Sequence, residues 1–103
     1  METDRYVRKV LHVEAVRITD ENFFEVAGWC QGLVFDMDTG KRLVKWDEAD
    51  PLGIYYIRVR VHFPQSPRHT KGYVGDWILY TDAGGYKVYS DRAFRGTFEK
   101  AAD

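Results

Sequence analysis

The short stretch Asp38-Thr39-Gly40 matches a catalytic motif. Retroviral-type aspartic proteases bring one such aspartate from each of two subunits together, and the pair shares a proton because two adjacent carboxylates cannot both ionise. That motif needs a buried apolar lead-in and a small apolar residue after the glycine, but here Asp36 precedes it and Lys41 follows. Because Asp and Gly favour turns, we interpret the stretch as a hairpin turn. A homodimeric aspartic protease using Asp38 therefore ranks third among the candidate functions.

The same turn is similar to the start of a calcium-binding loop. Asp36, Asp38 and Gly40 have the right residue types. However, the glycine comes one position early, and the twelfth position holds Asp47 where a calcium loop has a bidentate Glu. We therefore expect no calcium site.

The single cysteine, Cys30, is a candidate nucleophile if a histidine lies beside it. It falls on the apolar stripe of a predicted helix, and buried cysteines more often act as small core residues than as reactive thiols. The three histidines are far apart and lack the spacing of zinc ligands. We predict no catalytic residue, metal or cofactor, and thus no enzymatic activity.

A basic strand provides the most distinctive surface. Arg58, Arg60 and His62 alternate with apolar residues from position 57 to 63, so they project together if the apolar residues fill the core. The candidate binding set is Tyr56, Arg58, Arg60, His62, Arg68, Lys71 and Tyr73. Such a set could neutralise and stack on a nucleic-acid strand. From the strand pattern alone we favour the simpler interpretation, a solvated basic face that prevents edge aggregation.

Charge is divided unevenly along the chain. Residues 1–53 contain 7 Lys and Arg against 11 Asp and Glu, whereas residues 54–103 contain 8 against 5. No acid occurs from position 54 to 75. This separation points to a partner or to self-association more than to bulk polyanion binding.

The length and composition fit one soluble domain. The chain has 103 residues, of which 45% are hydrophobic and 16% aromatic, enough for a core without disulfides or metal. One cysteine suits a reducing cytoplasm. We expect no signal peptide and no membrane span, because the apolar runs are far shorter than the roughly 20 residues a bilayer requires.

One helix is predicted from about Asp20 to Gln31, with Thr19 as its N-cap. Its core-facing stripe has the spacing i, i+3, i+4, i+7, at Phe23, Val26, Ala27 and Cys30. Gly32 is placed to end the helix. Gly28, inside it, suggests close packing on the sheet.

The remaining pattern is typical of strands. They are expected at Val10–Ile18, Leu33–Phe35, Leu43–Trp46, Ile54–Phe63, Tyr73–Tyr80 and Tyr86–Tyr89, with Thr97–Glu99 as an edge. The apolar parity changes at Ala15-Val16, which favours a bulge over a strand buried on both sides. Gly75-Asp76 predicts a kink, and Trp77 just after it should be a principal core residue. Ser90 or Asp91 can cap one helical turn.

This order predicts an α+β fold in one domain, residues 1–103: a helix packed on a strongly bent, mainly antiparallel sheet that is partly barrel-like.

Several blocks together resemble a family of small accessory proteins of actinobacteriophages. They are Val13–Val16, Glu21–Phe23, Glu25–Cys30, Ile57–His62, Val74–Leu79, Tyr86–Tyr89 and Ala93-Phe94. The segment from Asp36 to Pro51 matches the pattern least, and it includes the Asp-Thr-Gly stretch. The resemblance implies a phage origin and no mechanism.

The leading hypothesis is a phage-encoded, non-enzymatic module that binds a protein, either a host factor or another phage component. It would act in the host bacterial cytoplasm or in the phage particle, and a homo-oligomer is a further option. The alternative is a nucleic-acid-binding module that uses the Arg58/Arg60 strand face.

Overall fold

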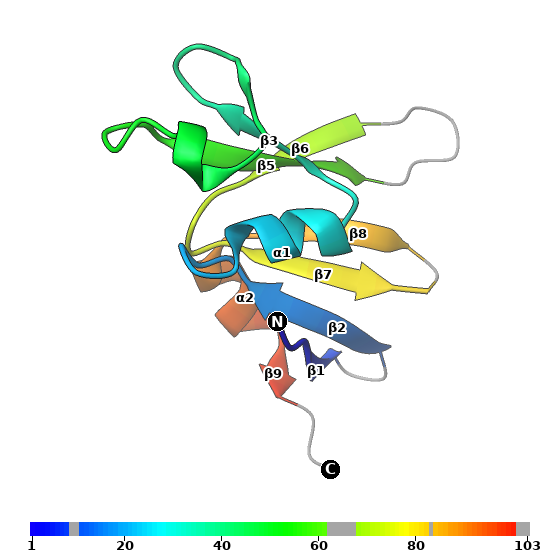
Figure 1. Ribbon diagram of the computed structural model, residues 1–103. Helices are drawn as coiled ribbons and strands as arrows, with labels where there is room; N and C mark the ends of the chain where they lie inside the picture. Colours follow the sequence, from blue (N-terminus) through cyan, green and yellow to red (C-terminus); the bar gives the residue numbers. More distant parts are fainter. Residues whose placement is uncertain (9–10, 62–67, 83, 101–103) are drawn as a thin grey trace.

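The computed structural model describes residues 1–8, 11–61, 68–82 and 84–100. Two α-helices and nine strands lie within these ranges (Figure 1). The order is β1 (Asp4–Arg8), β2 (Leu11–Arg17), α1 (Phe23–Trp29), β3 (Leu33–Asp36), β4 (Arg42–Leu43), the 3₁₀ helix η1 (Trp46–Glu48), β5 (Tyr55–Val61), β6 (Arg68–Gly72), β7 (Trp77–Thr81), β8 (Gly85–Tyr89), α2 (Asp91–Thr97) and β9 (Glu99–Lys100).

The strands form two antiparallel sheets, which confirms the α+β class. The larger sheet has the order β8-β7-β2-β1-β9, and the smaller one β4-β3-β5-β6. The sheets are not closed into a barrel, and β8 of the larger sheet lies against β5 and β6 of the smaller one. Figure 1 shows α1 between the two sheets, while α2 lies toward the other side of β2 and β7.

Strand β2 is buried on both faces, and this explains the change of parity in the sequence. Val16 and Ile18 belong to the core around α1, whereas Val13 and Ala15 belong to a second core under α2. The pairing of β2 with β7 is continuous through these residues. The predicted bulge is therefore wrong, and the alternative, a strand covered on both sides, is correct.

Helix α1 is shorter at both ends than the predicted span 20–31. It begins at Phe23 with Asn22 as its N-cap, so the predicted N-cap, Thr19, lies in the turn before the helix. There the Thr19 amide donates to Asn22 Oδ1 at 2.7 Å, and the Asn22 amide donates to Thr19 Oγ1 at 3.2 Å. The predicted stripe of Phe23, Val26, Ala27 and Cys30 is buried as expected.

The end of α1 differs from the prediction. Gln31, with φ of 58°, takes the left-handed conformation that was assigned to Gly32. Gly32 is needed for a different reason, since a Cβ there would lie 2.7 Å from Ile57 Cγ2 and 2.9 Å from the Arg58 carbonyl oxygen. The expected close packing at Gly28 is wrong, because a Cβ there would meet nothing within 4 Å.

Two polar strands were not predicted. Strand β1 pairs along β2, and β6 pairs along β5 from Ile57↔Gly72 to Val61↔Arg68. The predicted strand 73–80 is correct only in its second half, β7. Tyr73 and Val74 instead form a turn with Gly75, whose φ is 97°, and the Gly75 amide donates to the Ile18 carbonyl at 2.8 Å.

Helix α2 covers the outer face of the larger sheet. Ser90 caps it as predicted, accepting a hydrogen bond from the Ala93 amide, but it continues to Thr97. Phe94 is buried and stacks on Trp77, with ring centroids 3.9 Å apart. Trp77 is only partly buried, and its indole N–H donates to Asp91 Oδ1 at 2.9 Å. Trp77 thus packs against the core under α2, as expected, but it is not itself fully buried.

Candidate functional site

The smaller sheet separates apolar and basic residues onto opposite faces. In β5, Ile57 and Val59 are fully buried against α1, and Arg58 and Arg60 project from the other face. Residues paired directly across a sheet share a face. Arg58 pairs with Lys71 of β6 and Arg60 pairs with His69. The basic and aromatic residues on this outward side, here named the basic-aromatic face, are Phe35, Arg42, Tyr56, Arg58, Arg60, His69, Lys71 and Tyr73.

Cations of this face lie over its aromatic rings. The Arg58 guanidinium is 4.8 Å from the Phe35 ring centroid, and the Lys71 ammonium is 4.9 Å from that of Tyr56. Phe35 also stacks on Tyr56, with centroids 6.0 Å apart, and Tyr56 contacts Tyr73 at 5.8 Å. Cation–π contacts at exposed sites contribute about 0.5–1 kcal/mol each. The row of rings therefore holds two cations in place.

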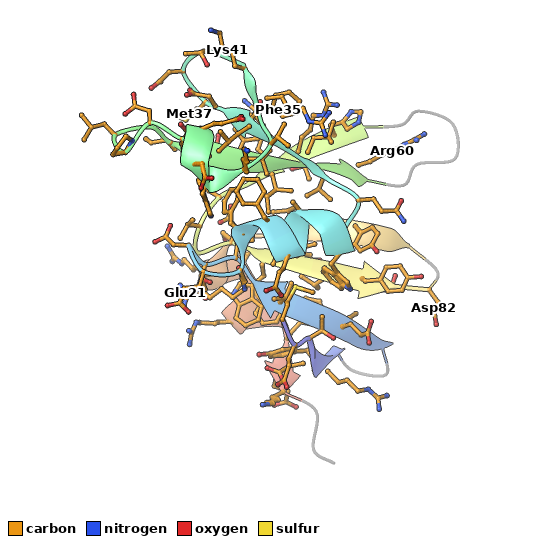
Figure 2. The ribbon with its side chains drawn as sticks, viewed as in Figure 1. Glu21, Phe35, Met37, Lys41, Arg60 and Asp82 are labelled. Atoms are coloured by element: carbon orange, nitrogen blue, oxygen red, sulfur yellow. The ribbon has the colours of Figure 1, made fainter. Side chains whose placement is uncertain are left out.

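The face is uniformly positive over the part of the chain that is described. None of its eight outward residues is acidic, and none of its cations takes part in the ion pairs found among the described residues. Figure 2 shows Phe35, Lys41 and Arg60 with the smaller sheet, while Glu21 and Asp82 lie at the level of α1 and the larger sheet. An anionic group would meet no like charge on this face.

The structure brings most of the predicted binding set together. Tyr56, Arg58, Arg60, Lys71 and Tyr73 all lie on the basic-aromatic face. Arg68 belongs to β6, opposite Val61, and only its backbone is described. His62 lies outside the described residues.

The sequence reasoning missed Phe35, Arg42 and His69 as members of this face. Their contribution depends on β3, β4 and β6 pairing around β5. The alternation of Leu33, Val34 and Phe35 is a signal that could have indicated an outward Phe35.

An apolar groove of about 520 Å³ lies at the end of the smaller sheet. It is lined by Asp20, Phe23, Trp46, Ala49, Asp50, Pro51, Gly53, Ile54, Tyr55, Tyr73 and Val74. Three of these large apolar side chains are exposed: Ile54 and Val74 at 50% each, and Trp46 at 39%. Tyr73 also belongs to the basic-aromatic face, so the two surfaces adjoin. The sequence did not single out this groove, because its residues come from three separate segments.

Residues proposed for nucleophilic or protease chemistry have ordinary structural surroundings. Cys30 is buried, and burial raises the pKa of its thiol to about 11. Asp38 is exposed in the turn between β3 and β4, where Asp36 Oδ1 accepts hydrogen bonds from the Asp38 and Thr39 amides at 2.7 and 3.0 Å. The turn thus accounts for the Asp-Thr-Gly stretch without catalysis.

Within the described ranges, no cluster of three or more His, Cys, Asp or Glu is arranged to hold a metal ion. Neither α-helix found in those ranges has the length and apolar character needed to cross a bilayer. Comparison of the chain with protein-family models, curated proteins and solved structures gave no match.

Proposed function

We propose that this chain is a phage-encoded accessory protein without enzymatic activity, which binds an acidic surface of a protein through the basic-aromatic face. The partner would be a host factor or another component of the phage, met in the host cytoplasm during infection or in the particle. The observation that carries the proposal is the arrangement of Arg58 and Lys71 over Phe35 and Tyr56 on a face without acids.

Arginine held over an aromatic ring is well suited to bind carboxylates. Its guanidinium presents a planar fork of N–H donors that matches a carboxylate in a two-bond contact. Because the ring already restricts the Arg58 side chain, less conformational entropy is lost on binding. Aromatic residues and arginine are also the residue types enriched at the energetic centres of protein interfaces.

Binding of single-stranded nucleic acid is the second candidate, favoured by the cations and rings sharing one face. Sequence-tolerant binding of this kind needs ring faces on which bases can stack. Here Phe35 and Tyr56 each contact both a neighbouring ring and a cation of the chain itself. Because these ring faces already contact other side chains, they are less available for stacking of bases. This favours a protein partner over nucleic acid.

Affinity capture with charge-reversed variants tests the proposal. The Arg58→Glu/Arg60→Glu variant should lose a protein that the wild type retains from nuclease-treated lysate of infected host cells. A matched control, Lys87→Glu/Arg92→Glu, changes two exposed cations outside this face by the same total charge, and it should retain the protein. Equal recovery with both variants would contradict the assignment of the face.

The second candidate has its own test in titration with a labelled single-stranded oligonucleotide. Contacts to phosphates make such binding fall steeply with salt. We expect no measurable binding at physiological salt, because few cations of this face are available to displace counterions. A sub-micromolar, salt-dependent complex that the Arg58→Glu/Arg60→Glu variant abolishes would put nucleic acid first.

A further inference from the structure

Aromatic contacts and hydrogen bonds within the fold fix the walls of the apolar groove. Trp46, in η1, contacts Phe23, Phe24 and Tyr55 with ring centroids 5.2, 4.9 and 5.7 Å apart. The Tyr55 hydroxyl accepts a hydrogen bond from the Asp50 amide at 2.7 Å. One wall is thus an aromatic cluster joined to the buried core.

The other parts of the groove are fixed by hydrogen bonds within short turns. Asp50 Oδ1 accepts from the Leu52 amide at 2.9 Å, and the Gly53 amide donates to the Asp50 carbonyl at 2.9 Å. Across the groove, the Tyr73 amide donates to Asp76 Oδ2 at 2.9 Å, which orders the turn carrying Val74. A preformed apolar hollow loses little entropy when a side chain enters.

The charge around the groove is opposite to that of the basic-aromatic face. Among its described lining residues are two acids, Asp20 and Asp50, and no Lys, Arg or His. In sequence, the lining is adjoined by three further exposed acids, Glu21, Asp47 and Glu48, against one exposed cation, Lys45. Figure 2 shows Glu21 beside the start of α1. An apolar hollow with an acidic rim complements an apolar side chain that has basic neighbours.

We propose that the apolar groove binds a basic segment of a partner protein, which inserts one large apolar side chain against Trp46, Ile54 and Val74. Lysines or arginines beside that side chain would face Asp20 and Asp50. This site is distinct from the basic-aromatic face, since an acidic surface that suits Arg58 would be repelled here. The domain would therefore bind two elements of opposite charge at adjoining surfaces.

A second copy of the chain is the less suitable occupant. The part of a second copy that most resembles such a segment is Arg42 to Lys45, where Val44 is 64% exposed between two cations, so a contact with the groove would join two different patches. Such head-to-tail contacts do not close into a dimer and tend to extend into rings or filaments.

Two matched peptides test the proposal. Both are acetylated and amidated with a central leucine, flanked on each side by two arginines in one and by two glutamates in the other. The Trp46 indole N–H signal in a ¹H–¹⁵N spectrum, assigned with a Trp46→Phe variant, reports occupancy of the groove. The arginine peptide should shift this signal with at least tenfold higher affinity than the glutamate peptide.

Variants of the groove and of the other face distinguish this site from the proposed function. Ile54→Ser/Val74→Ser should lower the affinity for the arginine peptide at least tenfold. Asp20→Asn/Asp50→Asn should remove most of the difference in affinity between the two peptides. Arg58→Glu/Arg60→Glu should leave both results unchanged.

Equal affinity for the two peptides, or no shift at Trp46 up to millimolar peptide, would overturn the proposal. A second outcome would also overturn the proposal. If the Trp46 signal shifts with increasing protein concentration in the absence of peptide, and Ile54→Ser/Val74→Ser abolishes that shift, the groove binds a second copy of the chain.

Discussion

The outer faces of the two sheets carry similar aromatic side chains but have different covers. On the larger sheet, Trp77 stacks on Phe94 of α2, and Tyr6 meets both rings edge-on, at 5.4 and 4.7 Å. On the smaller sheet, Phe35 and Tyr56 stack on each other. Among the described residues, cations from neighbouring strands of the same sheet are what lie over these rings.

The difference shows what each face needs for its stability. The larger sheet buries Val13, Ala15 and Leu79 under α2, so aliphatic residues fill that face. On the smaller sheet, the charged ends of Arg58 and Lys71 lie over the rings while the two residues stay partly or fully exposed to water. The first face is part of the core, whereas the second stays partly exposed.

Removing the contact between α2 and the larger sheet should have the largest effect on stability. Phe94→Ala is expected to lower the free energy of unfolding by about 3–5 kcal/mol, because Phe94 is 2% exposed and joins α2 to the larger sheet. Phe35→Ala, on the partly exposed face of the smaller sheet, should lower it by less than about 1.5 kcal/mol. Urea unfolding measures both. Similar losses of unfolding free energy in the two variants would contradict the distinction between a core face and a partly exposed face.

The interior side of the smaller sheet should protect Cys30. Its thiol is 2% exposed and burial raises its pKa to about 11, so it should react only in molecules that open. A disulfide reagent should therefore modify it at least about a thousandfold more slowly than in the denatured chain, in line with the small unfolded fraction of a folded domain. Rapid reaction in buffer would place Cys30 at the surface.

Low pH should weaken the attachment of α2 to the larger sheet. The hydrogen bond from Trp77 and the bonds from Arg95 lower the pKa of the Asp91 carboxyl. Because the pKa of Asp91 is lower in the folded state, its carboxylate stabilises the fold at pH values above its pKa in the unfolded chain. This stabilisation is lost as the pH falls through the pKa in the folded state. Asp91→Asn should reduce the pH dependence of stability on the acid side. Stability curves of equal slope for wild type and variant would contradict this role.

Charge reversal on the smaller sheet should have the smallest effect on folding. Because Arg60 is exposed and Arg58 partly so, Arg58→Glu/Arg60→Glu should change stability by no more than about 1 kcal/mol, allowing about 0.5 for each surface substitution. The cation–π contact of Arg58 falls within that amount. A thermal unfolding scan suffices. A much larger loss would make the face a structural element.

Local alternation predicted the parts of the fold that depend on one strand or helix. The inward Ile57 and Val59, the outward Arg58 and Arg60, and the buried stripe of α1 all follow from the side-chain period of their own element. This explains why the part of the basic-aromatic face on β5 was predictable, including Tyr56.

The parts that failed depend on pairing across the sheets. Strand β6 has the sequence Arg-His-Thr-Lys-Gly, which carries no apolar alternation, and it is a strand because β5 pairs with it. Strand β1 is explained in the same way by β2. The groove needs Trp46, Ile54 and Val74 to meet, and no local pattern indicates that contact.

The central claim, that a protein covers the basic-aromatic face, is most directly tested by photocrosslinking at position 56. A benzophenone-bearing phenylalanine in place of Tyr56 would lie among Phe35, Lys71 and Tyr73, and the same residue in place of the exposed Lys87 is the control. After irradiation in infected host cells, we predict an adduct at position 56 that protease removes and nuclease does not, with none at position 87. A nuclease-sensitive adduct at position 56, or equal adducts at both positions, would contradict the claim.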